Sequence, residues 1–67
     1  MTIKVRVTPR GQTLTLEQNR ITVKRLIAIL GLSIESAVVV RGEEPLLETD
    51  EIREGEEVTV VLVASGG

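Results

Sequence analysis

The residues of this sequence best suited to chemistry are two consecutive glycines, Gly66 and Gly67, at its carboxyl end. Glycine has no Cβ, so two in succession let the backbone adopt dihedral angles closed to other residues and pass through a slot too narrow for side chains. A carboxylate on such a tail can reach the active site of another protein. We therefore expect Ala64, Ser65 and Gly66 to form a tail that enters a partner's active site, with the reactive carboxylate on Gly67. The alternative is that the glycines are incidental, because small residues collect at chain termini.

The rest of the composition offers little for an enzyme. The 67 residues include no cysteine and no histidine. Disulfides, thiolate metal sites and thiol nucleophiles are therefore excluded, and the commonest general base and zinc ligand is missing. Ser65 has no accompanying base that would make it a nucleophile. We expect a protein that is not an enzyme and has no catalytic residue, metal site or bound cofactor of its own.

The net charge of −2 hides an uneven distribution along the chain. Residues 1–41 hold seven basic and two acidic side chains, a net charge of +5, whereas residues 42–67 hold one basic and eight acidic side chains, a net charge of −7. The basic half has no aromatic residue on which a base could stack. We expect no nucleic-acid partner.

The hydropathy pattern indicates neither a membrane span nor a signal peptide, since no apolar run is long enough for either. We therefore expect a cytoplasmic protein without a membrane partner. Several acidic residues crowd positions 48–57, but they lack the alternate spacing of a calcium loop. A solvated loop face is the better interpretation of these acids.

Two amino-terminal segments have the period of two that is typical of half-buried strands. Ile3, Val5 and Val7 alternate with polar residues, and Leu14 and Leu16 do so after a turn predicted at residues 9–11. Proline and glycine in that turn favour a hairpin.

The next segment predicts a short helix that begins after Thr22, a good N-cap residue, and ends at Gly31. Leu32 is placed to fold back on the last turn. The apolar residues of the helix form one stripe: Val23, Leu26, Ile27 and Leu30.

Three further segments complete the predicted elements. Residues 37–41 form a buried strand, a turn at 42–45 leads to a short strand at Leu46 and Leu47, and residues 58–63 form a β-branched central strand. Between them the chain is polar apart from Ile52, which we expect to close the bottom of the core.

These elements predict an α+β fold in which one helix crosses one face of a mixed four- to five-stranded sheet, with the first and last strands parallel at its centre. This is the β-grasp arrangement. We expect a domain of residues 1–63 followed by a flexible tail of residues 64–67.

The whole chain resembles the ubiquitin-like proteins, in particular the ThiS/MoaD group of small sulfur carriers and their archaeal modifier-like relatives. The resemblance rests on five patterns: the hairpin that starts at Ile3, the helix with Leu26 and Leu30, Ala37-Val38-Val39-Val40 before the Gly42 turn, the segment from Asp50 to Val58, and Gly66-Gly67.

The resemblance implies that an adenylyltransferase, similar to ubiquitin-activating enzymes, consumes ATP to activate Gly67. A desulfurase or rhodanese-like protein would then supply sulfur for a thiocarboxylate used in thiamine, molybdopterin or thiolated-tRNA biosynthesis. Two alternatives stay open: a protein modifier joined through Gly67 to target lysines, and a stand-alone binding module.

The resemblance also implies docking through the sheet face opposite the helix. If Val58, Val60 and Leu62 face the helix, Thr59, Val61 and Val63 must face outward. We expect these three residues, together with Arg6 on the first strand and Val39 and Arg41 on the third, to form a small apolar centre with a basic rim.

Overall fold

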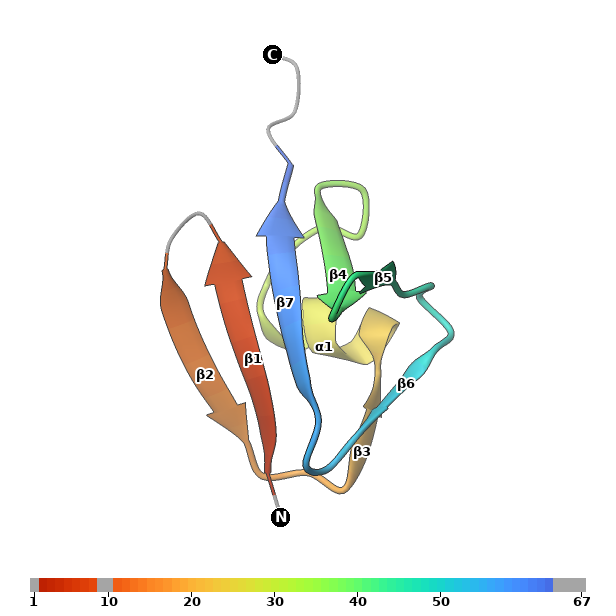
Figure 1. Cartoon of the computed structure of the whole chain (residues 1–67). Coiled ribbons are helices and arrows are strands. Elements are labelled where there is room, and N and C mark those ends of the chain that lie inside the picture. The colour runs from red at the N-terminus through yellow and green to blue at the C-terminus, as the bar shows by residue number, and fades with distance from the viewer. Residues whose placement is uncertain (1, 9–10, 64–67) are drawn as a thin grey trace.

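A computed structural model of the chain describes residues 2–8 and 11–63 (Figure 1). The elements follow in the order β1 (Ile3–Thr8), β2 (Gln12–Leu16), β3 (Arg20–Thr22), α1 (Val23–Ile29), β4 (Ala37–Arg41), β5 (Glu44–Pro45), β6 (Glu51–Arg53) and β7 (Glu57–Leu62). Five strands form one sheet in the order β2-β1-β7-β4-β5, and β3 pairs with β6 in a two-stranded sheet. Helix α1 packs on one face of the larger sheet (Figure 1). The predicted α+β, β-grasp fold class is confirmed.

The centre of the sheet is the parallel pair β1 and β7, in which Val5 lies opposite Val58 and Val7 opposite Val60. The pairs of β1 with β2 and of β4 with β7 are antiparallel. Gly11, which precedes β2, has a φ of +67°, a conformation that glycine adopts without steric cost. Pro9 and Arg10 of the predicted turn lie outside the described residues.

Helix α1 begins and ends as the sequence predicts. The Thr22 hydroxyl accepts a hydrogen bond from the Arg25 N–H at 3.2 Å, which caps the first turn. Gly31 has a φ of +72°, and the Leu32 N–H donates to the Ile27 carbonyl at 3.1 Å. A hydrogen bond of this kind around a glycine with positive φ is typical of the Schellman motif. It brings Leu32 back toward the core.

The first turn of α1 is also tied to a distant segment. The Val23 N–H donates to the Asp50 carbonyl and the Lys24 N–H to the Glu48 carbonyl, both at 3.0 Å. These N–H groups have no acceptor within the helix, so the segment of residues 48–50 satisfies donors that would otherwise need water. The segment that leads into β6 is thereby held against the start of the helix.

Two features of this region differ from the sequence-based prediction. The short strand is Glu44–Pro45, not Leu46 and Leu47, because the chain turns away from β4 after the Leu46 N–H donates to the Val39 carbonyl at 2.8 Å. Strands β3 and β6 were not predicted, since each has three residues with one buried apolar side chain. Their paired residues, Ile21 and Ile52, close the bottom of the core, and the expected position of Ile52 is confirmed.

The core is entirely aliphatic. Among the described residues no polar or charged side chain is buried. The buried side chains come from the larger sheet, the helix, the β3–β6 pair and the residue after β5: Ile3, Val5, Val7, Ile21, Val23, Leu26, Ile27, Ala37, Val39, Leu46, Ile52, Val58 and Val60. Helix residue Leu26 is fully buried among them.

Replacement of Leu26 by alanine should lower the free energy of unfolding by about 2–5 kcal/mol, through lost burial and the cavity that remains. Denaturant titration measures this loss. Leu47→Ala is the matched control, because Leu47 is 69% exposed and its truncation should change stability by less than about 0.5 kcal/mol. Equal losses in the two variants would contradict the assigned core.

Candidate functional site

The tail expected to do chemistry, Ala64 to Gly67, lies outside the described residues. The structure does show where the described chain leads into it. Strand β7 occupies the sheet between β1 and β4, and beyond it the Val63 N–H donates to the Ser36 carbonyl at 2.9 Å. The last described residue is therefore anchored to the residue that precedes β4.

The sheet face opposite the helix presents several of the predicted docking residues. In the parallel register Arg6 lies opposite Thr59, and Thr8 lies opposite Val61. Val61 and Val63 are 37% and 49% exposed, whereas Val58 and Val60 are buried toward the helix. The predicted orientation of β7 is therefore correct, and Arg6, Thr59, Val61 and Val63 keep their places on or beside this face.

The predicted orientation of β4 is wrong. Val39 is 1% exposed and belongs to the core, while its neighbour Val38 is 40% exposed and lies opposite Val61. The segment Ala37-Val38-Val39-Val40 contains no polar residue that would reveal which side chains face water. Its orientation is set by the register with β7, in which Val39 pairs with the buried Val60.

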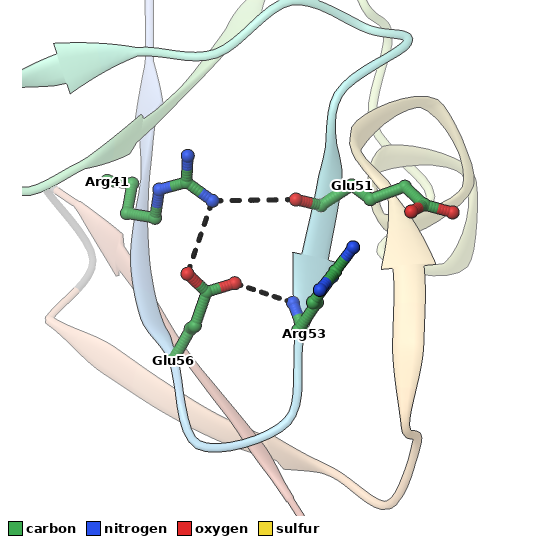
Figure 2. A network of polar contacts seen from close by, with 4 residues as sticks. All are labelled: Arg41, Glu51, Arg53 and Glu56. Carbon is green, nitrogen blue, oxygen red and sulfur yellow. Dashed lines mark hydrogen bonds and ion pairs between the residues drawn. The ribbon is translucent and has the colours of Figure 1, made fainter.

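Arg41 shares the side of β4 occupied by Val39, so its predicted place on the outward face is also wrong. Its guanidinium Nη1 lies 3.2 Å from Glu56 Oε2 and 3.5 Å from the Glu51 carbonyl oxygen (Figure 2). The second Glu56 oxygen accepts a hydrogen bond from the Arg53 N–H at 2.7 Å. Arg41 therefore joins the end of β4 to β6 and to the turn that precedes β7.

The outward face has four apolar residues, which we call the valine face: Val38, Val40, Val61 and Val63. Lys4 and Arg6 lie along its β1 side, but the predicted basic rim is weaker than expected. Glu57 lies opposite Lys4, and its Oε2 is 3.7 Å from Arg6 Nη2. Both partners of this ion pair are more than half exposed, so the pair adds little stability but offsets much of the local positive charge.

The acidic residues do not assemble a metal site in the part of the chain that the structure describes. Within residues 2–8 and 11–63, no three histidine, cysteine, aspartate or glutamate side chains lie close enough to hold a metal ion.

No helix formed by these residues is long and apolar enough to cross a membrane. The most distinctive surface at the end of β7 is the valine face.

Comparisons with known proteins place the chain among proteins of the same fold. No family model matches it. The fold is similar to that of a solved ubiquitin structure from Caldiarchaeum subterraneum, with a TM-score of 0.72 and 20% identity. The match covers 100% of this chain and 98% of that one. A computationally designed protein based on human erythrocytic ubiquitin gives a TM-score of 0.70 with 29% identity, over 98% of this chain and 95% of the other.

A curated relative adds sequence similarity to this likeness of fold. Over 59 residues the chain is 37% identical to the sulfur carrier protein TtuB of Thermus thermophilus. The match covers 88% of this chain and 89% of that protein. The chain thus belongs to the ThiS/MoaD-type family of ubiquitin-like β-grasp sulfur carrier proteins.

Proposed function

We propose that this protein is a sulfur carrier, and that a partner enzyme activates it at Gly67. The observation that carries the proposal is the 37% identity to a sulfur carrier protein over 89% of that protein's length. The aliphatic core and the absence of histidine and cysteine support a carrier in preference to an enzyme. The protein acts as a substrate of its partners.

The chemistry explains why a partner is needed. A free carboxylate is a poor electrophile, because an oxide is a bad leaving group, and the sequence has no nucleotide-binding loop of its own. An adenylyltransferase joins the Gly67 carboxylate to AMP from ATP and releases pyrophosphate. Sulfur from a donor such as a desulfurase or rhodanese-like protein then replaces AMP at the acyl carbon, which gives a thiocarboxylate.

The product is a sulfur donor held at the end of a narrow chain. The two glycines, 66 and 67, carry no side chain that would prevent passage into a partner's active site. The acceptor is an enzyme of thiamine, molybdopterin or thiolated-tRNA biosynthesis. Attack by a target lysine on the same adenylate would instead give a protein conjugate.

The valine face is the surface through which we propose that the activating enzyme holds the protein. Val61 and Val63 are exposed side chains next to the end of β7, and Val38 extends the apolar area onto β4. An apolar centre with polar residues around it is the pattern of a protein interface. Docking here places the residues after Val63 close to the bound enzyme.

Replacement of Val61 by aspartate should weaken binding to the activating enzyme at least about tenfold, since the new carboxylate is solvated in the free protein but loses water in the complex. Calorimetric titration measures the affinity. Ile29→Asp is the matched control, because Ile29 is 45% exposed on α1, outside the valine face. Equal affinities of the Val61 variant and the parent protein would remove this face from the interface.

Deletion of Gly67, or of both glycines, should abolish adenylation, because the carboxylate no longer reaches the nucleotide and a misplacement of about 1 Å can cost roughly a hundredfold in rate. Gly66→Val keeps the length but adds a β-branched side chain, and it should also lower the rate. The melting temperature of each variant should change by less than about 4 °C, since the described core residues all lie before residue 63. ATP–pyrophosphate exchange with the purified activating enzyme measures the rate.

The exchange assay also separates the alternatives. Exchange that persists without Gly67 would contradict activation at this residue. An intact protein that supports no exchange with any adenylyltransferase of its host would indicate a stand-alone binding module.

A further inference from the structure

A second apolar surface lies on the other side of β4, where β4 meets α1. It is a cavity of about 260 Å³. Buried residues of the helix, Val23 and Ile27, and of the β4 side, Val39 and Leu46, line its inner part. The proposed activation at Gly67 makes no use of this cavity, which we call the β4–α1 groove.

Exposed aliphatic side chains surround the groove. Ile34, Val38 and Leu47 also line it, and they are 39%, 40% and 69% exposed. Exposed apolar residues that gather around a concave site mark an interaction surface better than single ones do. The volume is below the roughly 300–1,000 Å³ of typical small-molecule pockets, so it suits side chains of a peptide better than a separate ligand.

The most exposed of these residues is held in a defined turn. The Leu47 N–H donates to Asp50 Oδ2 at 2.8 Å, and the Asp50 N–H donates back to the Leu47 carbonyl at 3.0 Å. The backbone carbonyl of the next residue, Glu48, accepts a hydrogen bond from the Lys24 N–H. These hydrogen bonds fix the backbone around Leu47 and leave its side chain exposed to water.

The opposite rim is ordered in a similar way. The Glu35 N–H donates to the Ser33 hydroxyl at 3.2 Å, and the Ser36 N–H donates to the Ser33 carbonyl at 3.0 Å. Ile34 lies inside this turn. Because both rims are already ordered in the free protein, this chain would lose little conformational entropy when a partner binds.

Part of the outer edge of β4 beside the groove is uncovered. On that side β5 pairs with Val40 and Arg41, and the Val39 carbonyl accepts from the Leu46 N–H, so among the described residues the part of the edge without a paired strand or this bond is Ala37 and Val38. An extended peptide can add to such an edge, with main-chain hydrogen bonds to β4 and alternate side chains in the groove. This geometry favours a strand over a helix as the occupant.

The acidic residues around the groove favour an occupant with positive charge. Among the described residues, Glu48 is the only charged one that lines it, and its carboxylate forms no ion pair with another of them. Glu35 adjoins Ile34, and Glu43 and Glu44 lie at the β4–β5 turn, all exposed. Basic side chains on the peptide would complement these acids.

We propose that the β4–α1 groove binds an extended segment of a partner protein that has aliphatic residues at alternate positions with lysine or arginine beside them. The aliphatic side chains fill the cavity above Val23 and Ile27, and the basic ones reach Glu48. Of the residues named here, this interaction shares only Val38 with the valine face, and it does not depend on activation at Gly67.

The probe is the blocked heptapeptide Lys-Thr-Leu-Thr-Leu-Thr-Lys, in which both leucines and both lysines share one face of a strand. Titration into the ¹⁵N-labelled protein should give saturable NMR shift changes at Ile34, Ala37, Leu47 and Glu48, with a dissociation constant below about 1 mM. Replacement of both peptide lysines by glutamate should weaken binding at least about fivefold.

Matched variants test the two parts of the site. Leu47→Ser and Glu48→Lys should each weaken peptide binding at least about fivefold. Ile29→Ser and Glu17→Lys are the controls, because both residues are exposed but lie outside the groove, and neither change should alter the affinity by more than about twofold. The groove variants should support ATP–pyrophosphate exchange at the parent rate, which separates failure of this proposal from failure of the proposed function.

Three outcomes of the titration would overturn the proposal: a dissociation constant above about 1 mM, equal affinities of the groove variants and the parent protein, or shift changes at Thr59–Val63 in place of the groove. Concentration-dependent shifts of the groove residues without peptide would assign the surface to a second copy of this chain and would equally exclude the peptide.

Discussion

The parallel pairing of β1 with β7 is the constraint on which the rest of this molecule depends. It brings Val5 and Val7 beside Val58 and Val60, so the two ends of the described chain make the centre of the core. Because side chains alternate along a strand, burial of Val58 and Val60 turns Thr59 and Val61 to the opposite face. One register thus sets both the hydrophobic core and the valine face on the opposite side of β7.

The carboxyl half is held to this centre by polar contacts that surround the core. The segment of residues 48–50 satisfies the first N–H groups of α1, and the Arg41–Glu56 contact joins β4 to the turn before β7. Arg41 and Glu56 are each about one-third exposed, so their ion pair is screened and orients the chain more than it stabilises it. The contact of residues 48–50 with α1 also holds the neighbouring Leu47 in its exposed position at the β4–α1 groove.

Elements with a clear period were predictable together with their faces, whereas β4 was predictable as a strand but not in its orientation. The alternation of Ile3, Val5 and Val7 and the capped stripe of α1 gave the correct faces, because polar residues separate the apolar ones. The uniformly apolar segment 37–40 gave the wrong face for Val39, since only pairing with β7 decides between its two sides. Strands β3 and β6 are too short to show any period, and the groove depends on tertiary contacts among α1, β4 and the turn at Leu47. The roles of Gly67 and its tail stay predictions, since these residues lie outside the described structure.

Mass spectrometry of the protein purified from its own cells tests whether it carries sulfur at its carboxyl end. We expect a fraction of molecules in which one oxygen of the terminal carboxyl group is replaced by sulfur, a replacement that is lost when Gly67 is deleted. A peptide carrying a Gly-Gly remnant on lysines of other proteins would show conjugation in addition. A carboxyl terminus that is unmodified under sulfur-replete growth, with no conjugates, would show that the protein is not a sulfur carrier.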